Sequence, residues 1–300
     1  MSLLSVIPRS PKLWLKARWL ALRARFVGIF LSYDAARLAA TLRALGIAPG
    51  DAVMLHSAFG GAHGFRGSID ELTRVFLDAV APNGHLLMVT LPYRSSSLQY
   101  LRTLRKFDVR TTPSMMGLVS EYFRRRPDVL RSVHPTHPVV VHGPRAEWFV
   151  NEHPACRHPC GPGSPFDKLA QADGKVAFFN VPFDTFTFFH HLEHLVHDRL
   201  PFALYSDEAF EVPVIDRAGE RRVVTTQVFA PDAIARRRFP ILEAALRRRG
   251  LIREQRVGNS RVQVIRVRDA IDCVMEMSRR GEYFYDLTPQ QAADAPPAIP

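Results

Sequence analysis

Hydrophobic positions along the chain change their spacing repeatedly, which predicts alternating helices and strands. Apolar residues at helical spacing indicate helices, and short apolar runs between turn residues indicate buried strands. The predicted helices cover residues 33–45, 68–80, 112–126, 232–249 and 269–280, and the predicted strands 53–56, 85–91, 139–142, 175–181 and 262–267. Two helix starts carry their own signal. Ser68 and Glu71 form a capping box, and Thr112 before Pro113 predicts an N-cap with proline in the first turn.

The pattern changes after residue 201. Residues 210–215 and 221–228 flank a turn with Gly219, which predicts a β-hairpin. We therefore expect one α/β domain over residues 31–287 with a hairpin-containing insertion near 207–228. Residues 1–30 form a separate basic segment, and the Pro- and Ala-rich residues 288–300 are expected to be disordered.

Composition is that of a globular protein. Three hundred residues that are 47% apolar can bury a sizeable core. Three cysteines, an odd number, argue against a disulfide framework and fit a reducing cytoplasm. The sequence contains neither an apolar run of the roughly 18–20 residues that span a bilayer nor a convincing signal peptide. We expect a cytoplasmic protein.

The net charge of +11 is unevenly distributed. Residues 1–30 contain no acid and six basic residues, namely Arg9, Lys12, Lys16, Arg18, Arg23 and Arg25. Between them Leu15, Trp19, Leu22 and Phe26 form an apolar stripe at helical spacing. Two interpretations stay open. Residues 9–26 make weak contact with a membrane surface, or they dock onto the domain or onto a partner subunit in a homodimer.

Other arginines come in short runs, at residues 124–126, 236–238, 247–249 and 279–280. Such runs are found on nucleic-acid-binding surfaces. Three of them directly precede Pro127, Gly250 or Gly281, where cations in a last helical turn complement the helix dipole. No nucleic-acid-binding motif accompanies them, and we expect no nucleic-acid partner.

The densest chemistry lies in residues 184–194, directly after the predicted strand 175–181. His190 and Glu193 are three residues apart on a predicted helix that continues through residue 197, so their side chains share a face. A histidine oriented by a carboxylate is suited to act as a general base. Two alternatives stay open. The H-x-x-E-H pattern also matches zinc peptidases in which His190 and His194 would hold the metal, or the helix simply carries surface histidines.

Three further segments carry candidate chemistry. Ser57, Gly60, Gly61, Gly64, Gly67 and Ser68 belong to a turn whose backbone N–H groups can approach a phosphate or a pantetheine amide, although a plain glycine-rich connection explains it too. His134 and His137 flank Pro135 in a rigid turn that places imidazoles in a cleft or partly buries them. His153, Cys156, His158 and Cys160 have zinc-ligand chemistry but crowd one proline-broken loop, so we expect no metal.

Taken together, these segments resemble the aminoglycoside 3-N-acetyltransferase family over residues 39–199. In order they are the LGIAPGD stretch at 45–51, the glycine turn, TPSMMG at 112–117, RSVHPTH at 131–137 and CGPGSPF at 160–166, followed by the residues around Asp184, Thr187, His190 and Glu193. The resemblance implies a three-layer α/β sandwich with a central mixed sheet flanked by helices, unrelated to the GNAT acetyltransferases.

The resemblance also implies a reaction, namely direct transfer of an acetyl group from acetyl-CoA to an amine. His190 would be the general base and Glu193 its orienting acid, with Thr187 and Asp184 shaping the site. The turn at 57–68 and Thr112, Ser114 and Met115 would line the channel for acetyl-CoA. His134 and His137 would contact the substrate. No metal is expected.

This sequence departs from the family pattern around the site. Pro138, Pro182, Phe186 and Phe188 replace smaller or polar residues, which indicates a changed acceptor. The basic net charge also disfavours polycationic aminoglycosides. We therefore expect an amino sugar, possibly nucleotide-linked and anionic, as the acceptor, and Phe186, Phe188 and Phe189 could also admit a longer acyl group. The alternatives are a zinc-dependent hydrolase and a relative that binds a ligand without catalysis.

Overall fold

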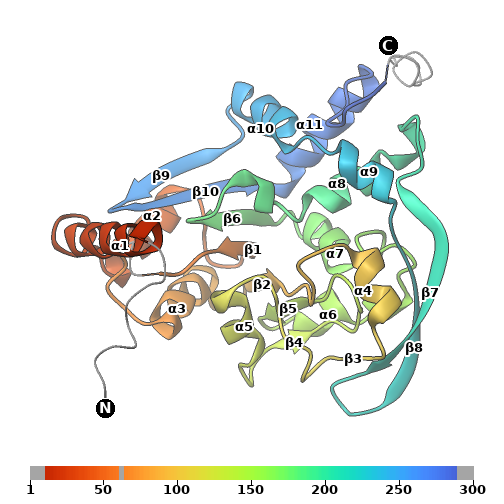
Figure 1. Cartoon of the computed structure of the whole chain (residues 1–300), viewed down its shortest axis with the longest axis horizontal. Helices are drawn as coiled ribbons and strands as arrows, with labels where there is room; N and C mark the ends of the chain where they lie inside the picture. Colours follow the sequence, from red (N-terminus) through yellow and green to blue (C-terminus); the bar gives the residue numbers. More distant parts are fainter. Residues whose placement is uncertain (1–10, 61–63, 289–300) are drawn as a thin grey trace.

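A seven-stranded mixed sheet forms the centre of the protein, whose computed structural model describes residues 11–60 and 64–288 (Figure 1). The strand order is β4-β5-β2-β1-β6-β10-β9. β2, β1 and β6 run parallel, and the outer strands are added antiparallel on both sides. These strands are β1 Ala52–Ser57, β2 His85–Val89, β4 Leu130–Arg131, β5 Val139–His142, β6 Lys175–Phe179, β9 Arg253–Val257 and β10 Ser260–Arg266.

Helices cover both faces of this sheet, which confirms the expected three-layer α/β class. Side chains of β1 alternate between the faces. Val53 and Leu55 pack with α2, α3 and α5, whereas Met54 packs with the layer of α6, α7, α8, α10 and α11. The helices are α1 Pro11–Phe30, α2 Ala35–Ala44, α3 Ile69–Val80, α4 Ser97–Thr103, α5 Leu118–Arg124, α6 Ala146–Val150, α7 Pro165–Gln171, α8 Phe189–Leu195, α9 Pro231–Arg236, α10 Phe239–Arg248 and α11 Val267–Arg279. Short 3₁₀ helices are η3 His153–Ala155, η4 Phe183–Thr185 and η5 His197–Arg199.

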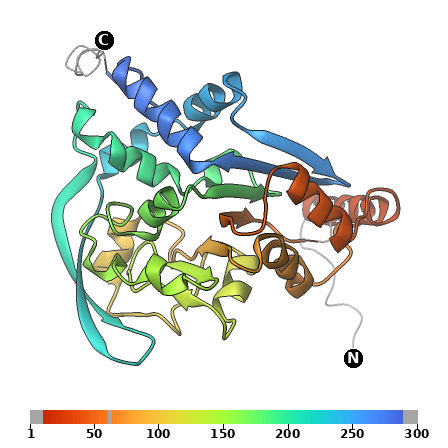
Figure 2. The same cartoon turned by 180° about the vertical axis from the view of Figure 1, so that it is seen from behind.

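A long hairpin, β7 Tyr205–Ile215 and β8 Arg221–Phe229, lies outside the central sheet. It pairs with β3 Phe107–Asp108 in a separate three-stranded sheet and curves along the side of the molecule opposite α1 (Figures 1 and 2). Its turn is closed by the Asp216 carboxylate, which accepts N–H groups of Ala218 and Glu220, each at 3.0 Å.

Two of the predicted helices are wrong in extent. The helix predicted from residue 112 begins only at Leu118. Thr112 is no N-cap, because its hydroxyl accepts the Asp108 N–H at 3.0 Å within a turn. The helix predicted over residues 232–249 is two helices, α9 and α10, separated by Arg237 and Arg238.

All three cysteines are free and buried. Within residues 11–60 and 64–288, no helix is long and apolar enough to cross a membrane. The tail predicted to be disordered lies, from residue 289 on, outside the described residues.

Candidate active site

A cavity of about 350 Å³ opens where the carboxyl ends of the parallel strands meet. This edge of an α/β sheet is where ligands usually bind, because the loops that leave the strands converge there. β1 contributes Leu55, His56 and Ser57, and the segments after β2 and β6 contribute Leu91 and Val181. The remaining lining residues are Val89, Met115, Met116, Ser120, Asp184, Thr185, Phe186, Thr187, His190 and Phe239.

His190 and Glu193 form a close pair at the wall of this cavity. The His190 Nδ1 lies 2.9 Å from the Glu193 Oε2, as their spacing on α8 predicts. Glu193 is fully buried, whereas the His190 side chain keeps 14% of its exposure. With Nδ1–H donating to the carboxylate, the basic lone pair of His190 is on Nε2. The pair therefore has the geometry of a carboxylate-oriented base.

Two residues from the distant C-terminal part complete the surroundings of Glu193. Arg237 Nε donates to Glu193 Oε1 at 2.6 Å, and the Tyr285 hydroxyl donates to the same oxygen at 2.5 Å. Arg237 also lies over the Phe229 ring, 4.6 Å from its centre. Sequence analysis missed both residues. The break between α9 and α10 is what turns Arg237 inward, and Pro240 was the available signal for it.

Burial and nearby charges favour the neutral form of His190 and the ionised form of Glu193. Burial is the largest cause that lowers the pKa of His190, and Arg237 lowers it further against the opposing effect of Glu193. Burial alone would raise the pKa of Glu193, but Arg237 and His190 hold it below its ordinary value. A neutral imidazole beside an ionised carboxylate is the state in which a general base accepts a proton.

Other imidazoles surround His190 without adding charge. The ring of His137 lies edge-on to His190, with 5.6 Å between the ring centres. His56 Nε2 lies 3.4 Å from the Thr187 hydroxyl at the cavity wall. Burial, and then His190, lowers the pKa of His56 to about 3 and that of His137 well below its usual value. Asp184 is exposed to solvent and is the one carboxylate among the described residues that line the cavity.

The TPSMMG segment contributes to the cavity through Met115, whose N–H bonds the Leu91 carbonyl at 2.8 Å. Ser114 is buried behind it, and its hydroxyl lies 2.9 Å from the hydroxyl of the lining residue Ser120. Thr112 does not line the cavity. Its carbonyl oxygen accepts a hydrogen bond of 2.5 Å from Arg131.

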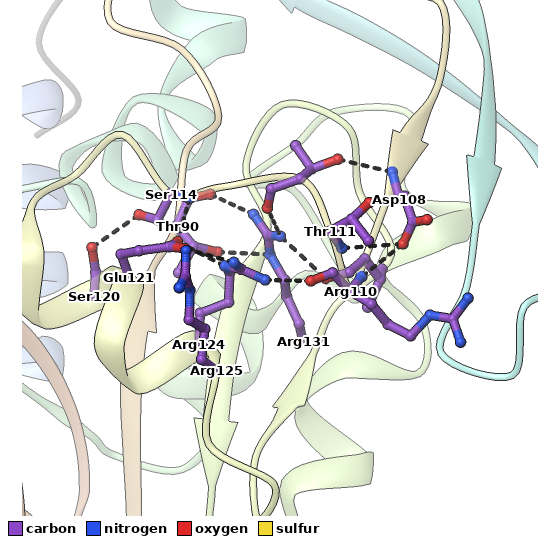
Figure 3. Close-up of polar contacts among 12 residues, drawn as sticks. Thr90, Asp108, Arg110, Thr111, Ser114, Ser120, Glu121, Arg124, Arg125 and Arg131 are labelled. Carbon is purple, nitrogen blue, oxygen red and sulfur yellow. Dashed lines mark hydrogen bonds and ion pairs between the residues drawn. The ribbon is translucent and has the colours of Figure 1, made fainter.

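A network of polar contacts fixes this segment in place (Figure 3). The buried Arg131 bonds the hydroxyl and carbonyl oxygens of Thr90 at 3.0 and 2.9 Å. Glu121 accepts the Ser114 N–H at 2.8 Å and pairs with Arg124 and Arg125, each at 2.7 Å. Figure 3 shows the Arg131 side chain between Thr90 on one side and Arg110 and Thr111 on the other. The network fixes the backbone of this segment and so fixes the position of Met115 at the cavity.

Among the described residues of the glycine turn, Ser57 lines the cavity and Gly60 does not. Gly61 lies outside the described residues. Gly64 packs against the backbone at Leu31, where a Cβ would come within 2.5 Å of the carbonyl oxygen. A Cβ on Gly67 would come within 2.6 Å of the Phe65 ring.

Ser68 is committed to its own helix. Its hydroxyl accepts the Glu71 N–H at 3.1 Å and its N–H donates to Glu71 Oε2 at 2.7 Å, which is the predicted capping box. Two of the donors and acceptors at the start of α3 are therefore already used within the helix. Gly64, Gly67 and Ser68 have structural contacts and do not line this cavity, and their contact with a cofactor stays a prediction.

His134 does not face the cavity either. It is fully buried, it stacks on His153 with 4.4 Å between the ring centres, and its Nδ1 accepts the backbone N–H of Thr136 at 3.3 Å. His137 is also buried and, like His134, is not among the lining residues, although its ring contacts that of His190. Contact of these two histidines with a substrate stays a prediction.

The residues of the alternative zinc motif point to different neighbours. The His194 Nδ1 lies 2.9 Å from the Tyr205 hydroxyl, and its ring stacks on His197. Glu193 is held by Arg237 and Tyr285. No cluster of three or more His, Cys, Asp or Glu side chains suited to a metal ion is found in the described part of the chain.

Comparison with known proteins decides the family. The profile of the aminoglycoside 3-N-acetyltransferase family matches residues 54–279. The chain belongs to this family. Aminoglycoside N(3)-acetyltransferase III of Pseudomonas aeruginosa is 31% identical over 176 residues, which cover 55% of this chain and 65% of that protein. Aminoglycoside N(3)-acetyltransferase IV of a Salmonella species is 26% identical over 257 residues, 85% of this chain and 91% of that protein.

Solved structures of this family share the fold. The aminoglycoside acetyltransferase AAC(3)-Xa superposes with a TM-score of 0.70 at 26% identity, over 87% of this chain and 96% of its own. The structure of AAC-IIIb with CoASH gives a TM-score of 0.70 at 27% identity, over 86% and 99% of the two chains. In sequence, however, the chain spans just under two thirds of the first relative named above.

Proposed function

We propose that this protein transfers an acetyl group from acetyl-CoA to the amine of a small molecule, with His190 as the general base. The observation that carries the proposal is the His190–Glu193 pair, 2.9 Å apart, at the wall of a cavity in a chain of this family. The relative solved with CoASH supports the same donor.

The chemistry follows from the protonation state of His190. An alkylammonium must lose a proton before its nitrogen can attack a thioester carbon. Neutral His190 takes this proton on Nε2, and Glu193 stabilises the resulting imidazolium through Nδ1–H. The new C–N bond forms as the C–S bond breaks, and the nitrogen then loses a second proton. One of the two protons is taken up by the departing CoA thiolate, and the other passes to solvent. Arg237 and Tyr285 act through Glu193 as positioning residues.

We assign the acetyl and pantetheine end of acetyl-CoA to the apolar side of the cavity. This side is formed by Met115, Leu91 and Val89, and Ser57 and Ser120 add polar groups. The acceptor is assigned to the side of Asp184 and Thr187. Phe186 lines the cavity, whereas Phe188 and Phe189 are buried in the core and do not line it.

We propose an amino sugar as the acceptor in preference to a polycationic aminoglycoside. Several ammonium groups require several carboxylates, and Asp184 is the one carboxylate that the described residues contribute to the cavity lining. The net charge of +11 points in the same direction. We also propose a cytoplasmic location, which the three free cysteines support.

The test is release of free thiol from acetyl-CoA in the presence of amino sugars, nucleotide-linked amino sugars and aminoglycosides. We expect amine-dependent release that falls by about 10²–10⁴-fold in His190→Ala, the usual contribution of a general base. His194→Ala is the matched control, since it makes the same change one turn along α8 in a residue that does not line the cavity.

Each other outcome has a distinct meaning. Release that survives His190→Ala refutes the base. Equal loss in both variants together with bound zinc would favour the hydrolase. Kanamycin or gentamicin acetylated as fast as the best amino sugar refutes the proposed acceptor.

A further inference from the structure

Helix α1 exposes an unusual amount of apolar surface. Of the fourteen large hydrophobic side chains that are exposed in the described residues, eight lie on this one helix, with exposed fractions between 43% and 68%. They are Trp14, Leu15, Trp19, Leu20, Leu22, Phe26, Ile29 and Phe30. So much exposed apolar surface on one helix indicates a partner that covers part of it.

Five of these eight side chains form an arc with basic residues on both sides, whereas Trp14 and Leu20 lie beyond those basic residues. At about 100° per residue, Leu15, Trp19, Leu22, Phe26 and Ile29 fall within an arc of about 80°. The basic residues flank this arc, with Arg18 and Arg25 on one side and Arg23 on the other. Arg18 and Arg23 lie over the rings of Trp14 and Trp19, with 5.2 and 5.4 Å from each guanidinium carbon to the ring centre.

The domain itself does not cover the arc. α1 is attached by its last turns, where Val27 is buried and the Leu31 carbonyl accepts the Asn259 N–H at 3.2 Å. Val27 lies about 120° around the helix from the centre of the arc, so the arc faces away from this attachment. Figures 1 and 2 both show α1 at the edge of the molecule, beside the tip of the β9–β10 hairpin.

The positive charge of this segment indicates which kind of partner covers the arc. The first acidic residue of the chain is Asp34, so the six cations before it have no acidic neighbour in their own segment. A second copy of α1 would bring cations against cations. A bilayer with anionic lipids matches both the arc and the arginines beside it. Its apolar layer can take up the arc, and its phosphates can bind the arginines on either side. Trp14 and Trp19 are of the type that prefers this interface.

We propose that α1 lies flat on the surface of a membrane that contains anionic lipid, with the arc immersed and Arg18, Arg23 and Arg25 bound to lipid phosphates. The attachment of α1 is close to Gly64, which follows β1 at the carboxyl edge of the sheet. The cavity is at this same edge. A membrane bound by α1 would therefore lie near the edge of the sheet that carries the cavity.

The test is flotation of the full chain with vesicles of phosphatidylcholine alone or with about 30% phosphatidylglycerol, read together with tryptophan emission. We expect at least tenfold stronger partition into the anionic vesicles, a blue shift of the emission, and weakening by salt. Arg18→Gln/Arg23→Gln/Arg25→Gln and Trp19→Ser/Leu22→Ser/Phe26→Ser should each reduce this partition at least tenfold.

Val223→Ser/Ile241→Ser/Met275→Ser is the matched control, because it removes three exposed apolar side chains from other elements. It should float like the unchanged protein. The proposal is overturned if the protein does not bind vesicles or binds both kinds equally. It is also overturned if the control loses as much partition as the α1 variants. A dimer in lipid-free buffer that the α1 serine variant alone converts to monomer, without lipid binding, assigns the arc to a second copy and also overturns it. Acetyl transfer to a water-soluble amine should be the same in all these variants, which keeps this test separate from the proposed reaction.

Discussion

Replacing Arg237 by glutamine tests how a buried cation controls the proposed base. Arg237 is 10% exposed, and its Nε donates to the carboxylate of Glu193, which is fully buried. The same carboxylate orients His190. The substitution removes one positive charge from the surroundings of His190 and leaves the contact between His190 and Glu193 in place.

The first effect is on stability. Removing one member of a buried ion pair typically costs about 3–5 kcal/mol, because the remaining charge stays buried without its partner. Both groups are almost fully buried, so solvent does not reduce this figure by much. Tyr285 and His190 still donate to Glu193 and soften the loss. Urea denaturation should therefore show a loss near the lower end of this range.

The second effect is on the pH profile. Arg237 is one of the causes that hold the pKa of His190 below its ordinary value. Without this cation the pKa of His190 rises, and since the base must be neutral to accept a proton, a larger fraction is inactive at acidic pH. The acid limb of kcat/KM should move to higher pH, so the variant should lose more activity in acid than at pH 8.

Arg238→Gln is the matched control. Arg238 carries the same charge one residue along the chain, but its side chain is 44% exposed and pairs with Asp286. It should leave both the acid limb and most of the stability unchanged. If the acid limb of Arg237→Gln coincides with that of the unchanged protein and of Arg238→Gln, the reasoning about the charge is refuted.

Three further substitutions separate structural roles from roles in the site. Ser68→Ala should cost about 1 kcal/mol of stability through the lost cap and leave the KM for acetyl-CoA unchanged; a raised KM would return this serine to the cofactor site. Met115→Trp should fill the cavity and raise the KM for acetyl-CoA at least tenfold with thermal stability little changed, and an unchanged KM would place the donor elsewhere. Tyr285→Phe should cost about 1.5–3 kcal/mol, since it removes a hydrogen bond to a buried carboxylate, and a variant as stable as the unchanged protein would contradict that bond.

Local signals predicted the layers of this fold well. Ser68 and Glu71 specified the start of α3, because a capping box is complete within four residues. The apolar run at β6 predicted a buried strand, because a strand covered on both faces is apolar at almost every position. Thr112 and Pro113 gave an equally good local signal and were misleading. The Arg131 side chain holds that segment as a turn. No residue close to Thr112 in sequence indicates this long-range contact.

The candidate site shows the same division. His190 and Glu193 could be paired from sequence, because helical spacing fixes their separation. Arg237 and Tyr285 could not, since they come from segments 44 and 92 residues away from Glu193. The arginine run at 236–238 was placed inside one predicted helix over residues 232–249, whereas α9 ends at Arg236. Position in the run does not show that its middle member turns toward the interior.

The contacts of Glu193 explain why these distant segments must meet. A carboxylate with no exposure is costly unless it is paired with an opposite charge and hydrogen-bonded. Arg237 supplies the opposite charge and Tyr285 a second donor, so Glu193 can remain ionised inside the protein. Only an ionised Glu193 can stabilise a protonated His190. The break between α9 and α10 and the position of Tyr285 after α11 are therefore as important for the proposed base as the spacing within α8, although neither residue lines the cavity.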